Sequence, residues 1–204
     1  MIFTLFIITI WVVISIIHAS FFEWTLHKYF MHKTTFGIEG PFQAHAVVHH
    51  QVFKADHTYH LQRNEDKKTI PMRWWHGPAL VASSTLIAQT VLQPLHVLCF
   101  GYLSLTGVIT MLVTIGLYFG TYERLHWCMH LPKKRVIQML GPIYKYFRKI
   151  NGHHLLHHRY MHKNYNVVLP IADFCLGTLM RRSPTFFKQA QGQDVPDVQP
   201  VLAD

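Results

Sequence analysis

Most of the 17 histidines in this chain fall in four short clusters. The clusters read HKYFMH from His27, HAVVHH from His45, HWCMH from His126 and HHLLHH from His153. Imidazole is a common metal ligand, and residues three or four apart return to the same side of a helix. The clusters therefore predict a metal site that holds more than one ion.

Ten of the clustered histidines are candidate ligands. The histidines of HWCMH and of HHLLHH have helical spacing, so each cluster can present its rings in one direction. His27 and His32 are five residues apart and need a helix end or a bend to meet the same metal. The ten candidates are His27, His32, His45, His49, His50, His126, His130, His154, His157 and His158.

The ligand chemistry favours a pair of iron ions. Imidazole suits zinc, copper, iron and nickel, whereas clusters almost without thiolate and carboxylate argue against iron–sulfur, calcium and magnesium sites. Ten ligands exceed the capacity of one ion, and two ions would each have about five positions, with room for dioxygen or water. Soluble di-iron bundles use two Glu-x-x-His motifs, and this chain has one, from Glu123 to His126. We expect two irons in a carboxylate-poor site, with zinc as the ion that can substitute.

Other polar residues near the clusters are expected to orient the ligands. A ligand histidine usually donates its second ring N–H to an acceptor, which fixes the tautomer of the ring. For each acid the alternative is a surface ion pair. The expected orienting residues are Glu23, Asp56, Glu123, Asp173 and His153.

Long uncharged segments adjoin the histidine clusters. Residues 2–22 form an apolar run that only His18 interrupts, and residues 74–122 carry no charged side chain. A bilayer core of about 30 Å needs about 20 helical residues, so these segments predict one span and then a hairpin of two, turning between Gln93 and Gly107. We predict an all-α integral membrane protein with about three transmembrane helices and a histidine-rich helical cap. The alternative is a buried helix pair in a soluble protein.

The distribution of charge predicts an orientation. All 19 basic residues lie between 28 and 73 or after 123, and basic residues collect on the cytoplasmic side. The chain would cross the membrane once before the first basic region and twice between the first region and the second. Both regions, and the histidine clusters with them, would then lie on the cytoplasmic face. The net charge of +9 then indicates lipid headgroups rather than nucleic acid as the acidic partner.

Two further expectations concern the ends of the chain. The N-terminal run has no basic start and no small-residue cleavage site, so we expect it to stay in the protein. Residues 1–182 would form one membrane-embedded oxygenase domain, and residues 183–204 a disordered polar tail. The short chain is typical of a compact enzyme of the bacterial inner membrane.

The four boxes together resemble a known family. EWTLHKYFMH, HAVVHH, YERLHWCMH and HHLLHHRYMHKNYNVVLPIADFCLGT are similar to the fatty acid hydroxylase superfamily of membrane di-iron oxygenases, which includes sterol desaturases, sphingolipid hydroxylases and carotenoid hydroxylases. The similarity covers residues 20–180 and is most specific in the last box, which ends with Asp173, Gly177 and Thr178.

The resemblance implies a function. The ten histidines would bind two irons beneath a transmembrane bundle, dioxygen would be activated there, and a C–H bond of a lipid would be hydroxylated or desaturated. The lipid would be a fatty acyl chain, with a carotenoid or a sterol as the alternative. Reducing equivalents would come from a separate ferredoxin, rubredoxin or small cytochrome, for which the basic segment 133–150 is a candidate docking or headgroup-binding surface.

The sequence departs from the family pattern at two places. The second box has three residues before its paired histidines where two are common, so His45 is the least secure ligand and His57 or His60 could replace it. Ala172 stands where the family commonly has an aromatic residue.

Two other classes of protein stay open. His18 and His96, each inside a span, could clamp a haem in a membrane cytochrome. A histidine-rich metal-binding or metal-transport membrane protein is the second class, although transport sites normally lie near the bilayer midplane and most of these histidines lie outside the spans.

Overall fold

The structure is a computed structural model that describes residues 2–181, so the expected polar tail 183–204 lies outside the described residues. Within the described range the chain forms helices and no strand, as predicted. The elements are α1 (Ile2–Leu26), η1 (His27–Met31), α2 (Gly40–Phe42), η2 (Gln43–His49), α3 (His50–Val52), η3 (His57–Tyr59), η4 (Asn64–Thr69), α4 (His76–Phe100), α5 (Leu105–His130), α6 (Lys133–Leu140), η5 (Gly141–Ile143), α7 (Tyr144–Arg159) and α8 (Ile171–Cys175).

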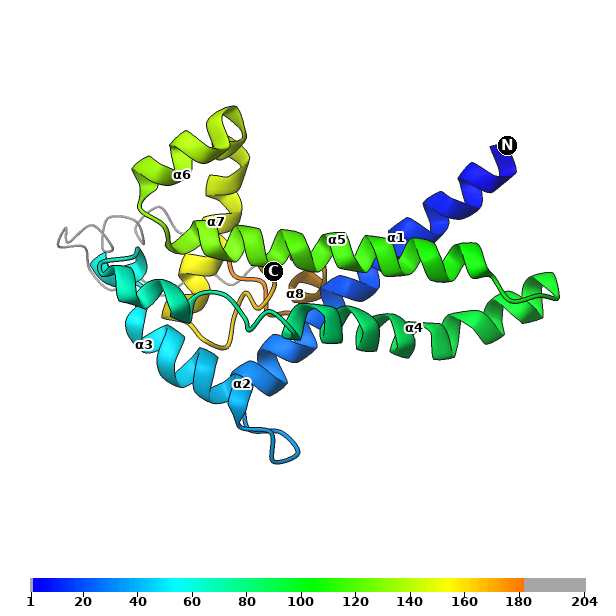
Figure 1. The fold of residues 1–204 in the computed structure, drawn as a ribbon, viewed down its shortest axis with the longest axis horizontal. Helices are drawn as coiled ribbons and strands as arrows, with labels where there is room; N and C mark the ends of the chain where they lie inside the picture. The colour runs from blue at the N-terminus through cyan, green and yellow to red at the C-terminus, as the bar shows by residue number, and fades with distance from the viewer. Residues whose placement is uncertain (1, 182–204) are drawn as a thin grey trace.

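Three long helices form the body of the molecule. Helices α4 and α5 make an antiparallel hairpin, and α1 crosses it obliquely (Figure 1). α4 ends at Gly101, whose φ of +79° is readily available only to glycine, and Ser104 caps α5 by accepting the Gly107 N–H at 3.0 Å. The side chain of Gln93 closes the turn by pairing with the backbone of Ser104. The helical hairpin and the predicted region of its turn are confirmed.

The crossing of α1 and α5 depends on one glycine. A Cβ atom at Gly107 would lie 2.3 Å from Cε2 of Trp11, so no other residue permits this approach. Nearer to the histidine-bearing ends of the two helices, Ala19 of α1 packs with Met111 and Ile115 of α5, and all three are fully buried. Small residues at the contact allow the helices to pack tightly.

Two segments, Thr4–Met31 and Leu105–His130, are long and apolar enough to cross a membrane. Large apolar side chains remain on their outer faces: Phe6 is 61% exposed and Leu117 69% exposed. α4 is of similar length, carries Ser83 and Gln89 among its apolar residues, and is not one of the two.

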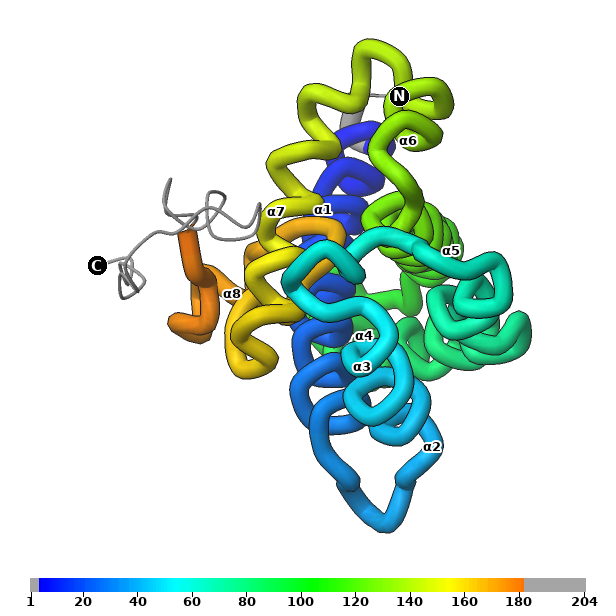
Figure 2. Tube along the Cα trace, turned by 90° about the vertical axis from the view of Figure 1, so that its left-hand side faces the viewer, coloured from blue at the N-terminus to red at the C-terminus, as the bar shows by residue number. Residues whose placement is uncertain are grey.

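The short helices gather at one end of the three-helix body. Figure 1 places α2, α3, α6 and α7 at one end of the long axis, and the α4–α5 turn at the other. Figure 2 looks at the first of these ends, where α3 and α7 lie beside each other in front of α1 and α5. The histidine clusters, a hundred residues apart in the chain, therefore meet in one region.

Two of the histidine boxes are wound as π-helices. In η1 the His32 N–H donates to the His27 carbonyl at 3.1 Å, and in η2 the His50 N–H donates to the carbonyl of His45. A π-helix bonds each residue to the one five positions back, so residues five apart lie over one another. This winding is the bend that the spacing of His27 and His32 required, and it serves His45 and His50 in the same way.

Candidate metal centre

One group of five histidines comes from three parts of the chain. The Nε2 atoms of His27 and His45 are 2.8 Å apart, and Nε2 of His50 is 3.1 Å from that of His45. Nε2 of His32 lies 3.0 Å from that of His157. The five side chains each offer a nitrogen within 4.8 Å of the others. His45, the least secure candidate by sequence, thus lies in the middle of this first group.

A second group of four histidines adjoins the first and consists of His49, His130, His154 and His158. Nε2 of His154 lies 3.2 Å from that of His130 and 3.0 Å from that of His158. Offered nitrogens again lie within 4.8 Å of one another, and all four residues are buried. Both groups consist of imidazole alone.

His126, the tenth candidate, lies at the edge of the second group. Its ring centroid is 4.8 Å from those of His49 and His154. The carbonyl of Ile70 bonds to one ring nitrogen, and Nε2 is buried without a hydrogen-bond partner. Nε2 of His49 is buried and unpartnered in the same way. With His126 included, each group has five histidines.

Backbone carbonyls fix the tautomers of most of these rings. A carbonyl oxygen can only accept, so a ring bonded to it through Nδ1 carries its proton there and leaves the lone pair on Nε2. Thr69 and Tyr59 accept from Nδ1 of His49 and His130 at 3.2 and 2.9 Å. The remaining pairs are His27 with Tyr165, His157 with Lys163 and His158 with Phe53.

The acceptors divide between two loops in the same way as the ligands divide between two groups. Carbonyls of residues 53–70 serve His49, His126, His130 and His158, all in the second group. Carbonyls of residues 163–165 serve His27 and His157, both in the first. These acceptors were missed by sequence reasoning, because a carbonyl leaves no mark on residue type.

The donor set of the second group fits a metal ion. Three nitrogens, on His130, His154 and His158, share two contacts of 3.0–3.2 Å. His130 and His158 carry their protons on Nδ1, so their Nε2 atoms cannot donate. At most one proton, on Nε2 of His154, is left to make both contacts. A metal bound through nitrogens at about 2.0–2.1 Å places neighbouring ligands about 3 Å apart, and the observed spacing agrees with that value. A cation among the lone pairs satisfies all of them at once.

Burial keeps the ligands neutral. It lowers the pKa of His49 to about 3 and that of His32 to about 4. Burial also lowers the pKa values of His154, His157 and His158 well below their usual range. At neutral pH these imidazoles are therefore unprotonated and able to bind metal.

Asp173 and Glu23 bond to the backbone near the ligands, and not to the ligand rings as predicted. Neither accepts the ring N–H of a ligand. Asp173 accepts the backbone N–H groups of Tyr165 and Asn166 at 3.0 and 2.7 Å and the Thr178 hydroxyl at 2.6 Å. The carboxylate thus holds the loop whose Tyr165 carbonyl receives His27.

Glu23 links the helices behind this loop. It accepts the Tyr118 hydroxyl at 2.7 Å, the Val167 N–H at 2.6 Å and the side-chain amide of Asn166 at 3.1 Å. This single carboxylate on α1 therefore ties α5 to the loop that precedes α8.

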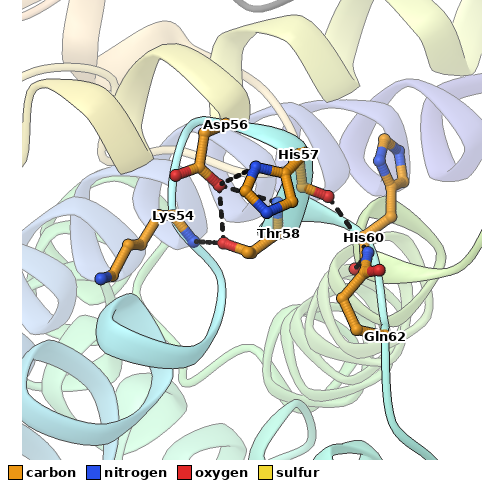
Figure 3. A network of polar contacts seen from close by, with 6 residues as sticks. All are labelled: Lys54, Asp56, His57, Thr58, His60 and Gln62. Carbon is orange, nitrogen blue, oxygen red and sulfur yellow. Dashed lines mark hydrogen bonds and ion pairs between the residues drawn. The ribbon is translucent and has the colours of Figure 1, made fainter.

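Figure 3 shows the polar contacts of the loop before η4, in which Asp56, His57 and Gln62 are exposed. Asp56 accepts from the backbone and hydroxyl of Thr58 at 2.7 Å, and it lies 3.9 Å from Nδ1 of His57. The His57 side chain is 86% exposed, and His60 packs on Tyr59. Neither histidine belongs to a group, so the structure does not place them as replacements for His45.

The last predicted positions lie outside both groups. Glu123 on α5 bonds to the backbone of Met72. The backbone oxygen of His153 accepts from Asn164 at 3.2 Å. Ala172 is fully buried, and its N–H donates to the Ser20 hydroxyl.

The two histidines inside the long helices have separate local partners. Nε2 of His18 lies 3.0 Å from both the carbonyl and the hydroxyl oxygen of Ser84. Nδ1 of His96 donates to the Tyr102 carbonyl at 2.9 Å. These bonds account for both histidines without a haem.

Comparisons of this chain with models of protein families, with curated proteins and with solved structures found no match.

Proposed function

We propose that the protein is a membrane-bound, dioxygen-dependent di-iron oxidoreductase that hydroxylates or desaturates a C–H bond of a lipid such as a fatty acyl chain. A carotenoid or a sterol is the alternative substrate. The observation that carries the proposal is the presence of two adjoining histidine groups, buried except for the half-buried His32 and free of thiolate, at one end of a long apolar helix bundle.

The histidines would divide the two irons between them. His27, His32, His45, His50 and His157 would hold one, and His49, His126, His130, His154 and His158 the other. When bound, the irons would supply the redox chemistry that activates dioxygen. The protein sets the geometry, keeps the ligands neutral and excludes water from their surroundings.

In the proposed arrangement α1, α4 and α5 cross the membrane and the histidine groups lie on its cytoplasmic face. Support comes from the lengths of the three helices and from the basic residues near the histidine-bearing ends. A helix of 25 residues is about 37 Å long, enough for a hydrocarbon core of about 30 Å. We place the protein in a bacterial inner membrane.

A separate electron carrier would bind near α6 and α7. A cavity of about 570 Å³ lies there, and its lining includes Lys133, Arg148, His57 and His60. Tyr59 also lines this cavity, and its ring lies 4.9 Å from that of His130. An acidic ferredoxin, rubredoxin or small cytochrome docked on Lys133 and Arg148 would approach the second group through one aromatic side chain, and its binding should weaken as salt rises.

The test combines two measurements on the full chain. Metal analysis of the purified protein should find two irons per chain, and lipid extracts compared by mass spectrometry with and without expression should show a gain of one oxygen or a loss of two hydrogens. A haem absorption band would indicate a cytochrome. Metal uptake driven by an ion gradient, with no change in any lipid, would indicate a transporter.

A further inference from the structure

A groove runs along the α4–α5 hairpin, apart from the histidine groups. Its volume is about 470 Å³, within the range of about 300–1,000 Å³ that is typical of small-molecule sites. The side chains that line it are apolar except for Glu123. Leu112, Ala82 and Gly120 are exposed at its rim, so the groove opens on the outer face of the helix pair.

Glycines create this groove. A Cβ atom at Gly77 or Gly120 would meet no other atom within 4 Å, and one at Gly116 would meet only Val81, at 4.0 Å. These glycines therefore differ from Gly107, where a side chain has no room. Glycine is less favourable than alanine inside a helix, and what these glycines provide is open space rather than close packing.

The groove leads toward the metal centre. Leu112, Gly116, Gly120 and Glu123 recur every three or four residues, so they lie along one face of α5. The same spacing continues to His126. At 1.5 Å per residue the track is about 16 Å long from Leu112 to Glu123, and His126 is about 4.5 Å further along the axis.

Glu123 closes the inner end of the groove with an unused acceptor. The Met72 N–H bonds to its carboxyl group, but its Oε1 atom is buried and has no hydrogen-bond partner. Leaving a buried acceptor unpaired has a free-energy cost. Turning the carboxyl group about its Cγ–Cδ bond would present this oxygen to the groove, and a donor there would then remove the cost.

We propose that the groove binds a long-chain lipid whose neutral polar end, a hydroxyl or an amide N–H, donates a hydrogen bond to Oε1 of Glu123. The apolar tail lies along α5 between Gly116 and Leu112. An ionised fatty acid fits less well, because its carboxylate has no proton to donate. As a statement about substrate the inference rests on the proposed function, and it places the carbons next to the polar end nearest to His126.

Photo-crosslinking of the full chain in lipid nanodiscs tests the site. The probe is hexadecanol with a diazirine near the middle of its chain, and the competitors are hexadecanol, hexadecyl methyl ether and palmitate. We expect labelled peptides from residues 77–82 and 112–120, with hexadecanol competing about tenfold better than its methyl ether or palmitate, as for a buried hydrogen bond that is either made or left unmade.

Four variants sharpen the test. Gly120→Leu fills open space and should lower labelling at least about tenfold, whereas Thr121→Leu, which adds bulk at an exposed position of α5 outside the groove, should leave it unchanged. Glu123→Met should bring the alcohol and its ether within about twofold of each other, and Glu123→Gln, which keeps an acceptor, should restore most of the preference.

Equal labelling in Gly120→Leu, or an alcohol and an ether that compete equally in the wild type, would overturn the inference. Labelling needs no turnover and can be measured with and without metal, so the two proposals fail separately. Selective labelling without any lipid oxidation contradicts the proposed function alone. Lipid oxidation that persists without labelling of the groove contradicts this inference alone.

Discussion

The imidazole of His50 stacks on that of His158, with ring centroids 4.2 Å apart and planes inclined by 20°. The two residues belong to different groups, and each is the second member of a histidine doublet. His49 and His50 divide between the groups, and so do His157 and His158. Neighbouring residues point their rings in different directions along a helix, so each doublet supplies one ligand to each site and holds the two sites side by side.

Because each doublet gives one ligand to each group, we expect separate substitutions of its two histidines to remove different ions. His157→Ala removes a ligand of the first group and His158→Ala one of the second, so each should lower the tightly held metal from two ions per chain toward one. Either change, and likewise His130→Ala, should abolish lipid oxidation while membrane insertion persists. Metal analysis and lipid mass spectrometry measure both effects. His162→Ala, at an exposed position four residues beyond the doublet, is the control and should be mild.

Asp173→Asn tests whether the loop before α8 orients the first group. The substitution keeps the size of the side chain and weakens its bonds to the N–H groups of Tyr165 and Asn166. The Tyr165 carbonyl would then hold His27 less firmly, and loss of such outer support typically lowers metal affinity about 10- to 100-fold. Metal-competition titration measures the change, with Asp56→Asn, on the surface loop, as the control. Equal affinities in both variants would contradict this role.

Gly107→Ala should destabilise the packing of α1 against α5. Its methyl group would lie 2.3 Å from Trp11, and forcing an extra carbon into a packed contact costs about 1–3 kcal/mol. Thermal unfolding in detergent should show a lower midpoint. Gly120→Ala places the same methyl group in open space and should not lower it. A similar loss in both variants would contradict a specific role for the contact between Gly107 and Trp11.

The sequence predicts a large part of this architecture because its strongest signals are periodic and local. The apolar runs predict the long helices, and Gly101 lies in the expected turn. The spacing of His27 and His32 indicated a bend but not a π-helix, since i to i+5 bonding depends on contacts that a one-dimensional pattern does not contain. The carbonyl of Tyr59 was equally invisible, because every residue has one and only the fold selects which accepts a ring N–H.

Metal removal should destabilise the cap more than the helices. Without cations, the Nε2 lone pairs of His130 and His158 face that of His154, with one proton to share between two contacts. Ligand binding to the folded state alone adds about 2.7 kcal/mol when the free ligand is at a hundred times its dissociation constant. A chelator should therefore lower the unfolding midpoint, and added iron or zinc should restore it. His154→Ala relieves the crowding and removes a ligand, so its midpoint should respond less to the chelator. A wild-type midpoint that ignores both chelator and metal would contradict a metal centre built from these residues.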